Sequence, residues 1–443
     1  MRASTAPDNT DRRFRSPSAT GGFWLKVYDV LLTLGVLVAR GLAPFHPKLR
    51  ETLRDRRSGA DGWQIGTTDS RPLVLIHAAS YGEFEGARPL IERLIADGKC
   101  RVAVSYSSPS ARRTVDNTPG LWARGYLPLD YLDQQLRLLG KLEPAVVLVA
   151  KHDFWPNLIR ASAALNVPLL LVNANFHPGS YRTFPVVRAF HRAFMRPIRA
   201  VWAVSEADAD RVRPLLSPET GLSAVGDTRY DRVRQRAGKG AERFRPLKEA
   251  LGKGPVIVAG STWLPGERVC WEAFAALHRD YPEARLVIAP HEPTPGTLKR
   301  NRSVASHHNL NIRLFSSWDG APIEESVLMI DRVGVLAELY AVGWAAYVGG
   351  GFGRGVHSVL EPAAHGVPVA FGPRHHVSCE AGQLLRCGGG FLVRSALEQE
   401  RLWRKWLSNP ESYRRAALAA DELVRSQEGA TDRLVKLLDP YLE

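Results

Sequence analysis

The chain has 443 residues, which is long enough for two domains of ordinary size. Its hydrophobic share of 45% and charged share of 23% are those of a globular protein and exclude a wholly disordered chain. The formal net charge of +14 indicates an acidic partner: nucleic acid, an anionic membrane or a phosphorylated substrate. Because the sequence has no zinc-finger spacing and no aromatic RNA-binding signature, we expect no nucleic-acid partner.

Four scattered cysteines form no CxxC pair, which argues against both a disulfide framework and a zinc site and indicates a reducing compartment. No other cluster of metal-ligand residues stands in the sequence, so we expect neither a metal nor another cofactor. Asp208 and Asp210 do form the D-x-D pattern of metal-dependent sugar transferases. Because Ser205 is placed to cap their helix, we interpret both as part of a solvated helix face.

The N-terminal region begins with a polar segment, residues 1–22, that is typical of a disordered tail. Residues 23–45 are predicted to form a membrane-anchor helix whose apolar core is flanked by Asp29 and Arg40. This core is shorter than the roughly 20 apolar residues of a strict membrane span. The helix therefore either crosses with its charges at the interfaces or lies in the interface, and a buried helix of a globular domain is the third possibility.

Basic residues follow this helix and predict that the next domain lies on the cytoplasmic side of the membrane. They are Arg40, Lys48, Arg50, Arg54, Arg56 and Arg57.

From residue 72 onward, apolar runs alternate with amphipathic helices, which is typical of a doubly wound parallel sheet. Residues 231–254 are charged and glycine-rich and are the predicted linker. The alternation then restarts with GPVIVAGST at residue 254. We therefore expect an α/β fold of two facing Rossmann-like domains, 46–240 and 241–443, with a cleft between the carboxyl ends of their strands.

The segment HAASYGEFEGARPLIERL reads as the end of a strand, a turn and a helix with Glu83 and Glu85 near its start. Acidic residues at a helix start are stabilised by the helix dipole, which is the simpler interpretation. The functional interpretation places a carboxylate at the mouth of the cleft as a general base.

A second strand of the first half ends in Lys151, His152 and Asp153. Trp155 and Pro156, which follow, fit a packed helix start. The three charged or titratable residues before them are harder to explain by packing.

In the second half, five glycines fall within the seven residues from Gly349 to Gly355, and a helix is predicted to begin near His357. Glycines let a backbone approach an anion, and a helix start offers N–H groups to it. Arg354 adds a positive charge, and Glu361 is placed to accept hydrogen bonds from a ribose. A structural glycine turn with a solvated Arg and Glu is the alternative.

Two further strands of this half end in polar residues on the predicted cleft side. Ser261 and Thr262 are placed either to cap a helix or to hold a phosphate. His291 follows the next strand, where a structural role and a binding role are equally compatible with the sequence.

Taken together, these motifs resemble the 3-deoxy-D-manno-octulosonic acid (Kdo) transferases, which are inverting, membrane-anchored GT-B glycosyltransferases of lipopolysaccharide synthesis. The resemblance covers about nine-tenths of the chain and rests on HAASYGEFEGARPLI, KHDFWPN, VGDTRYDRV, AGSTW, APHEP and YVGGGFGRGVHSVLEPAAHGVPVAFGP, which occur in the family's order and spacing. It implies CMP-Kdo as donor, a bisphosphorylated lipid A precursor as acceptor, an anionic inner membrane as partner and no metal.

The resemblance also assigns roles to residues. Glu83 matches the catalytic glutamate, which would face the donor across the cleft. The expected donor-binding residues are Ser261, Thr262, His291, Gly349, Gly350, Gly351, Arg354, His357 and Glu361. The expected acceptor-binding residues are Ser80, Gly82, Lys151 and Asp153.

The chain departs from the family at three places. The usual E-x-E-x-W-P-N motif is KHDFWPN here, and Pro290 and Asn175 stand where arginines are usual. Arg354 is our candidate for the cation that holds the donor phosphate or the Kdo carboxylate. Two alternatives stay open: another nucleotide-sugar enzyme, such as a UDP-sugar transferase or an epimerase, and an inactive membrane-surface lipid-binding protein.

Overall fold

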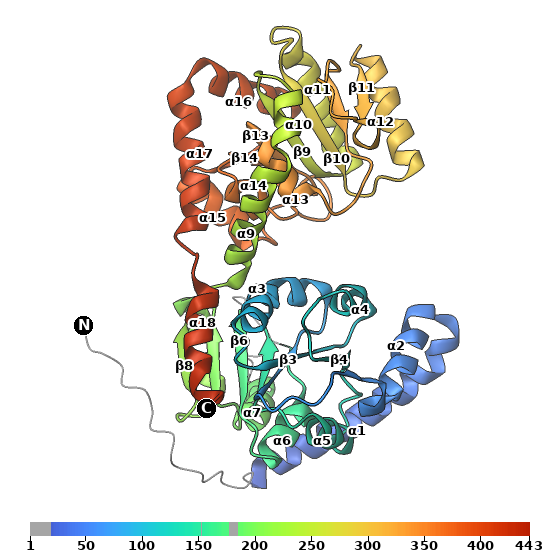
Figure 1. Cartoon of the computed structure of the whole chain (residues 1–443), viewed down its shortest axis with the longest axis vertical. Coiled ribbons are helices and arrows are strands. Elements are labelled where there is room, and N and C mark those ends of the chain that lie inside the picture. Colours follow the sequence, from blue (N-terminus) through green and yellow to red (C-terminus); the bar gives the residue numbers. More distant parts are fainter. Residues whose placement is uncertain (1–18, 152, 177–184) are drawn as a thin grey trace, which may run out of the picture. The chain divides into compact units, whose positions relative to one another are not determined.

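The computed structural model of the chain describes residues 19–151, 153–176 and 185–443, so most of the predicted tail and His152 lie outside the described residues. The chain forms two compact units, which are shown in Figure 1. Unit 1 comprises Met1–Arg229 and Gly429–Glu443, and unit 2 comprises Tyr230–Glu428.

Unit 1 contains an eight-stranded sheet in the order β1-β4-β3-β2-β5-β6-β7-β8. All of its neighbouring strands are parallel except β1 and β4. The strands are β1 Gln64–Ile65, β2 Leu73–His77, β3 Arg101–Tyr106, β4 Ala123–Tyr126, β5 Val146–Ala150, β6 Leu169–Ala174, β7 Ala200–Ala203 and β8 Gly221–Ala224. The predicted doubly wound parallel sheet of the first half is therefore confirmed.

Helices cover both faces of this sheet and bury the apolar runs that predicted its strands. One face packs against α1 Ala19–Leu42, α5 Leu132–Leu142, α6 Pro156–Ala164 and α7 Pro185–Met195. The other packs against α3 Tyr81–Asp97, α4 Pro109–Asp116 and α18 Ala430–Leu438. The remaining helices of unit 1 are α2 Pro47–Arg57 and α8 Glu206–Val212.

Unit 2 contains a fully parallel seven-stranded sheet in the order β11-β12-β10-β9-β13-β14-β15. Its strands are β9 Val256–Thr262, β10 Arg285–Pro290, β11 Ile312–Leu314, β12 Val327–Met329, β13 Ala345–Val348, β14 Val369–Phe371 and β15 Gly390–Leu392. Its helices are α9 Thr228–Arg243, α10 Arg245–Ala250, α11 Leu264–His278, α12 Pro295–His307, α13 Leu336–Leu339, α14 Leu360–Ala364, α15 Cys379–Cys387, α16 Ala396–Ser408 and α17 Pro410–Arg425. The second predicted sheet is also confirmed.

The boundary between the units differs from the prediction in two ways. The units divide at Arg229 rather than at residue 240, and the segment predicted as a linker is helical, in α9 and α10. These charged helices are amphipathic and bury Tyr230, Ala237 and Leu247 in the core of unit 2. One of their charges, Arg234, also faces the unit and pairs with Asp421 and Glu428. In addition, α18 returns to unit 1, where Leu434 enters the core.

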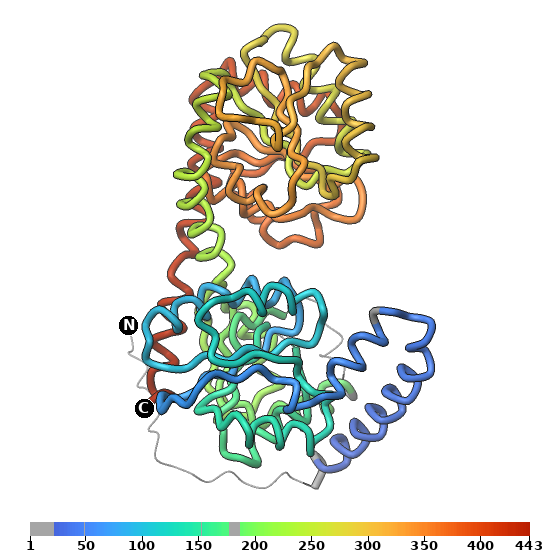
Figure 2. The backbone as a smooth tube through the Cα atoms, turned by 45° about the vertical axis from the view of Figure 1, so that its right-hand side comes forward, coloured from blue at the N-terminus to red at the C-terminus, as the bar shows by residue number. Residues whose placement is uncertain are grey.

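The N-terminal helix α1 has one face on unit 1 and one face exposed. Figure 2 shows α1 and α2 together at one edge of the unit. Leu25 is buried, the Tyr28 hydroxyl donates to Asp130 at 2.8 Å, and Arg160 donates to Asp29 at 3.1 Å. The exposed apolar residues of α1 are Phe23, Val30, Leu31, Leu34, Leu37, Val38 and Leu42. The possibility that this segment is a buried core helix is therefore wrong.

The same helix satisfies the length and composition of a membrane segment. Among the described residues, one helical stretch passes that test, Gly22–Phe45, with a mean hydropathy of 1.6. Not all of the basic residues that follow this helix lie on the surface. Arg56 is 7% exposed and donates to the backbone oxygens of Leu127 and Pro128, so it holds the β4–α5 loop.

Candidate active site

The strand orders of the two sheets predict where each unit binds a ligand. In a doubly wound sheet, ligands bind outside the carboxyl ends of the two strands at which the chain order reverses. In unit 1 these strands are β2 and β5, and in unit 2 they are β9 and β13. The residues that the sequence analysis selected lie at or just after the carboxyl ends of these four strands: Ser80 to Glu83, Lys151 and Asp153, Ser261 and Thr262, and Gly349 to Gly351.

Glu83 lies in the first turn of α3, beyond the carboxyl end of β2, and is half-buried. Its Oε2 accepts hydrogen bonds from the backbone N–H of Ser80 at 3.0 Å and from the Ser80 hydroxyl at 3.3 Å. Glu83 lies in the first turn, as the helix-dipole interpretation expected, and it also forms a capping box with Ser80, which the sequence analysis did not predict. The capping uses one carboxylate oxygen and fixes the side chain, and Gly82 is exposed beside it.

Asp153 is held by a buried histidine that the sequence analysis did not select. His77 ends β2 and is fully buried; its Nε2 lies 3.1 Å from Asp153 Oδ2, and the Trp155 indole N–H donates to the same oxygen at 2.7 Å. The position of His77 at a strand end, opening the selected segment, was the signal that could have identified it. The neighbouring Lys151 has φ of 62°, and its backbone N–H donates to the Val172 oxygen at 2.8 Å.

A buried arginine lies behind this group. The Arg56 guanidinium stacks 4.7 Å from the centre of the Trp155 ring. Burial lowers the pKa of Arg56, and the carboxylates of Asp130 and Asp153 oppose this shift. A cation therefore stacks on the ring of the indole whose N–H donates to Asp153.

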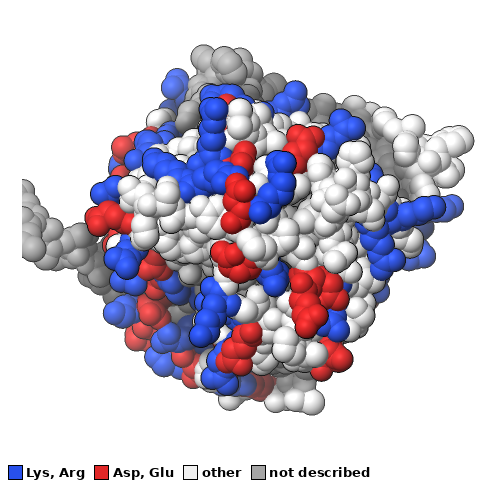
Figure 3. Space-filling model, turned by 90° about the horizontal axis from the view of Figure 1, so that it is seen from above, with Lys and Arg blue, Asp and Glu red and all other residues white. Residues whose placement is uncertain are grey.

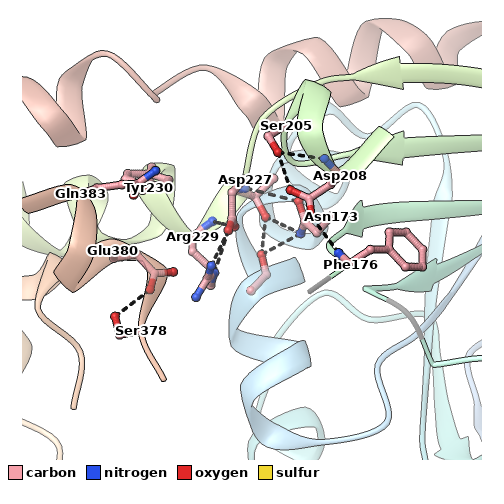
Figure 4. Close-up of polar contacts among 12 residues, drawn as sticks. Asn173, Phe176, Ser205, Asp208, Asp227, Arg229, Tyr230, Ser378, Glu380 and Gln383 are labelled. Atoms are coloured by element: carbon pink, nitrogen blue, oxygen red, sulfur yellow. Dashed lines mark hydrogen bonds and ion pairs between the residues drawn. The ribbon is translucent and has the colours of Figure 1, made fainter. Parts of the chain in front are cut away.

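Beyond β6, a polar network joins α3 to the start of α9 and is shown in Figure 4. The side-chain amide of Asn173 donates to the Thr228 hydroxyl at 2.6 Å, and this hydroxyl donates to the Gly86 oxygen. Arg229 pairs with Asp227, with Nε 2.8 Å from Oδ2. The motif VGDTRYDRV thus fixes the last segment of unit 1 against the helix that carries Glu83.

The interpretation of Asp208 as part of a solvated helix face is wrong. Asp208 is 8% exposed and accepts a hydrogen bond from the backbone N–H of Phe176 at 2.7 Å (Figure 4). The Ser205 hydroxyl also donates to it. Because this carboxylate is used to hold the segment after β6, it serves the fold; Asp210 is exposed as predicted.

In unit 2, the glycines after β13 allow close approach of backbones. A Cβ at Gly349 would lie 2.1 Å from the Ser261 oxygen, and one at Gly351 would lie 2.7 Å from the backbone nitrogen of Gly372. Gly350 has φ of 90°, where a Cβ would also lie 2.1 Å from the Gly355 oxygen. Close backbone packing therefore explains these three glycines, as the structural alternative expected. The same packing brings β9, β13 and the segment after β14 together at one point.

Three aromatic side chains stack beside this point. The ring of His291 lies 4.7 Å from that of Trp263 and 4.5 Å from that of His357, and the Trp263 indole N–H donates to His357 Nε2 at 2.9 Å. Burial lowers the pKa of His357, and His291 adds to this effect. His357 therefore stays neutral near pH 7 and accepts the indole hydrogen bond through Nε2.

The end of β9 presents one predicted residue and buries the other. Ser261 is half-buried and has φ of 50°, an unusual value for a residue other than glycine. Thr262 is 2% exposed, and its hydroxyl donates to Glu267, which pairs with Arg300 at 3.0 Å. Because the Thr262 hydroxyl is used in this way, any contact of Thr262 with the sugar donor would be made by its backbone.

The helix after the glycine loop differs from the prediction. It was expected to begin near His357, but α14 is Leu360–Ala364 and has five residues. The loop from Gly351 to Gly355 folds back, with the Gly355 N–H donating to the Gly350 oxygen, and this delays the helix start. Glu361 is half-buried in the first turn of α14, and Arg354 is exposed in the loop.

A second arginine, which the sequence analysis missed, lies beside this loop. The Arg374 guanidinium donates to the Gly353 oxygen at 2.7 Å, and its backbone N–H donates to the Gly351 oxygen at 2.8 Å. Arg374 follows β14, about twenty residues after the glycine loop, so no sequence motif or regular spacing connected it with the glycines. Within the described part of the chain, no group of three or more His, Cys, Asp or Glu residues is placed to hold a metal ion.

Comparisons with known proteins agree with this arrangement. Residues 52–232 match the family model described as 3-Deoxy-D-manno-octulosonic-acid transferase (kdotransferase). The chain is 27% identical over 382 residues to the 3-deoxy-D-manno-octulosonic acid transferase of Haemophilus influenzae, covering 84% of this chain and 87% of that protein. It is also 27% identical over 437 residues to the enzyme of the same name from Bordetella pertussis, covering 92% and 98%.

Solved structures share the fold. A UDP-GlcNAc 2-epimerase from Neisseria meningitidis bound to UDP-GlcNAc has a TM-score of 0.58 at 15% identity, covering 83% of this chain and 99% of that chain. A glycosyltransferase from Rickettsia africae has a TM-score of 0.53 at 12% identity, covering 84% and 98%. These two likenesses show the two-unit α/β fold of GT-B glycosyltransferases and nothing about the substrate.

Proposed function

We propose that the chain is a Kdo transferase, and so a glycosyltransferase, that transfers Kdo from CMP-Kdo to a bisphosphorylated lipid A precursor, lipid IVA. The transfer inverts the anomeric configuration, needs no metal and serves the synthesis of the lipopolysaccharide core. The observation that supports this proposal most is topological. The family's motif residues lie beyond β2 and β5 in one unit and beyond β9 and β13 in the other, where each doubly wound sheet binds its ligand.

Glu83 is the proposed general base. It removes the proton of a primary hydroxyl on the acceptor, and that oxygen attacks the anomeric carbon of Kdo from the face opposite CMP. The bond between this carbon and the phosphate oxygen breaks, and CMP leaves with the bonding electron pair. General-base assistance of this kind contributes on the order of 10²–10⁴ in rate. The hydrogen bonds from Ser80 to Oε2 hold the carboxylate in one orientation while Oε1 takes the proton.

The donor site is proposed at the carboxyl edge of β9 and β13. Backbone N–H groups of the glycine loop and Ser261 receive the phosphate, and Glu361 accepts hydrogen bonds from the ribose. The negative charge on departing CMP needs a cation. Since His357 is neutral near pH 7, Arg354 supplies that charge, and Arg374 holds the loop on which Arg354 lies.

The acceptor site is proposed around Ser80, Gly82, Lys151 and Asp153, with α1 bringing the chain to the inner membrane. Arg160 binds Asp29 in the middle of α1, and Asn157 also donates to it at 2.8 Å. Crossing the bilayer would withdraw this carboxylate from both partners, so these contacts support a helix lying in the interface with its exposed apolar face in the lipid. The catalytic units then lie on the cytoplasmic side.

Charge also supports a membrane acceptor. The net charge of +14 favours an anionic surface. Figure 3 shows Lys and Arg side chains interspersed with Asp and Glu on the face it presents, so that face carries no single basic patch. The orientation at the membrane is assigned to the exposed apolar face of α1, and the net charge adds a long-range attraction to an anionic surface.

The test uses the purified full-length chain in detergent with CMP-Kdo and lipid IVA, both with and without EDTA. We expect CMP release and a lipid product heavier by one or more Kdo residues, with the same rate in EDTA. UDP-GlcNAc replaces CMP-Kdo in a parallel reaction and should be neither transferred nor epimerised. Binding of the lipid without release of CMP would contradict the proposal and favour an inactive lipid-binding protein.

A further inference from the structure

The first turn of α6 is capped by a residue from a distant segment. Backbone N–H groups at a helix start have no partner within the helix. In α6 the backbone N–H of Asn157 donates to Asp130 Oδ2 at 2.9 Å, and that of Leu158 donates to Oδ1 at 3.0 Å. Trp155, directly before the helix, makes no side-chain capping bond. The fully buried carboxyl group of Asp130, from the segment between β4 and α5, therefore holds this helix start in place.

Helix α1 binds the same group through two consecutive residues. The Tyr28 hydroxyl donates to Asp130 Oδ2 at 2.8 Å. Asp29 accepts from the side-chain amide of Asn157 at 2.8 Å and from Arg160 at 3.1 Å. One turn of α1 is thus joined both to the cap of α6 and to the first turn of α6 itself.

The start of α6 also controls a side chain of the acceptor motif. The indole N–H of Trp155 donates to Asp153 Oδ2 at 2.7 Å, and the Arg56 guanidinium stacks on the same indole. Arg56 in turn donates to the backbone oxygens of Leu127 and Pro128, in the segment that carries the cap. Because packed interiors transmit small displacements, a shift of the cap moves the indole that orients Asp153.

The turn of α1 that makes these contacts has its other side exposed. Val30 and Leu31, which follow Asp29 directly, are 59% and 61% exposed. Apolar side chains on such a helix face are buried when the helix lies in the lipid interface. Since neighbouring residues of a helix move together, the seating of α1 in lipid also sets the positions of Tyr28 and Asp29.

We propose that α1 does more than anchor the chain: its seating in the lipid interface fixes the orientation of Asp153 at the acceptor site. Tyr28 and Asp29 are positioning residues, which act through Asp130 and the start of α6 on the indole that binds Asp153. The role of Asp153 toward the acceptor rests on the proposed function. Acceptor binding is then strongest when the helix lies in the lipid that also holds the acceptor.

Steady-state kinetics of the full-length chain in mixed micelles test this, with lipid IVA and CMP-Kdo varied in turn. Tyr28→Phe removes one hydroxyl, and Asp29→Asn removes the charge that Arg160 binds. Each should raise the acceptor KM about threefold to tenfold, at most the effect of one lost hydrogen bond, and leave the donor KM unchanged. Thr33→Val is the matched control, because the exposed Thr33 hydroxyl bonds only within α1, to the Asp29 backbone oxygen. It should keep both wild-type KM values.

Hydrogen–deuterium exchange gives a readout that does not need the reaction. The backbone amides of Asn157 and Leu158 bond to Asp130, so their exchange reports on the cap. In the wild type they should exchange more slowly on vesicles of phosphatidylethanolamine and phosphatidylglycerol than in detergent. Tyr28→Phe and Asp29→Asn should lose this protection and still co-sediment with the vesicles, because their exposed apolar face is unchanged.

The outcomes separate this proposal from the proposed function. Wild-type acceptor KM and wild-type exchange at the α6 start in both variants would overturn it. A rise of both KM values with a lower melting temperature would also overturn it, as a general structural defect, and so would a loss of co-sedimentation, as a role in anchoring alone. If the wild type forms no Kdo product while exchange still responds to vesicles and to both variants, the link from α1 to α6 stands and the proposed function fails.

Discussion

The imidazole of His77 joins Asp153 to the core of unit 1: its Nε2 lies 3.1 Å from Asp153 Oδ2, and its Nδ1 lies 2.9 Å from the Ser105 hydroxyl. His77 is fully buried, whereas the side chain of Asp153 is 28% exposed. The histidine therefore fixes the position of a carboxylate that stays accessible. This makes His77 a positioning residue for the acceptor side of the proposed reaction.

His77→Leu roughly keeps the volume and removes the contact of His77 with Asp153, which leaves the Trp155 indole as the partner of that carboxylate oxygen. We expect the acceptor KM to rise about tenfold, as for one lost hydrogen bond, with the donor KM unchanged. His77→Gln retains a donor for Asp153 and should restore most of the acceptor affinity. Steady-state kinetics with each substrate varied in turn check this, and equal changes in both KM values would show a general structural defect instead.

Glu83→Gln should separate capping from catalysis. The amide oxygen of Gln still accepts the Ser80 N–H, so we expect the free energy of unfolding to change by less than about 0.5 kcal/mol. It cannot take a proton, so the transfer rate should fall by about 10²–10⁴ while CMP-Kdo still binds. Glu85→Gln is the control, because Glu85 pairs with Arg88 at 2.5 Å. A Glu83→Gln enzyme that turns over at the wild-type rate would falsify the base assignment.

Gly349→Ala tests the close backbone packing at the donor site. The new Cβ would lie 2.1 Å from the Ser261 oxygen, and both groups are backbone-bound and unable to rotate away. We expect a loss of about 2 kcal/mol or more in the free energy of unfolding, measured by denaturant titration. Gly353→Ala, in the same loop, has its nearest neighbour at 3.7 Å and should cost far less. Equal costs for the two would argue against the packing explanation.

The carboxyl of Asp130 makes stability depend on pH. Burial raises its pKa to about 7 from 3.8, although the N–H groups of Asn157 and Leu158 and the Tyr28 hydroxyl favour the charged form. Between these two values the folded state binds a proton that the unfolded state has released. The free energy of unfolding should therefore fall as pH rises from about 4 to about 7, by at most about 1.4 kcal/mol per pH unit.

Asp130→Asn should remove this slope while keeping an oxygen that accepts from the Asn157 N–H. Denaturant titrations of the two proteins in detergent, at several values across this pH window, give the difference directly. Identical slopes for wild type and variant would mean that Asp130 does not exchange its proton on unfolding.

Leu34→Glu tests the exposed face of α1. Leu34 is 54% exposed, so a carboxylate there costs little folding free energy but opposes insertion into lipid. We expect the variant to lose co-sedimentation with vesicles of phosphatidylethanolamine and phosphatidylglycerol. Leu418→Glu, which changes a leucine 67% exposed in unit 2, should sediment with them as the wild type does. Loss of sedimentation in both variants would trace the effect to net charge alone.

Local patterns predicted most of the fold. The apolar runs 72–80 and 254–262 became β2 and β9, and Pro156 begins α6 as expected. The strand order, in which β2 lies beside β5 and β9 beside β13, is the order expected for a doubly wound sheet and is not contained in any local pattern. It places the selected residues at the switch point of each sheet, where the prediction expected a ligand.

Burial was decided by the tertiary structure. Arg56 and Asp208 read as surface charges because their neighbours in sequence are polar, yet each satisfies backbone groups of a distant segment and is less than 10% exposed. The charged segment 231–254 read as a linker, but its two helices turn their apolar faces to the core. The periodicity of apolar residues shows which residues share a helix face, but it does not show which part of the protein that face packs against.

The sequence by itself determined the two sheets and the motif residues at their strand ends, and these motifs carry the resemblance to the Kdo transferases. The tertiary structure decided which of these side chains cap a helix, pair inside the core or stay accessible: Glu83 caps and stays half-exposed, Thr262 turns inward, and His77 holds Asp153. The physical reason is that a hydrogen bond between distant segments depends on three-dimensional distance, which local propensity and spacing do not contain.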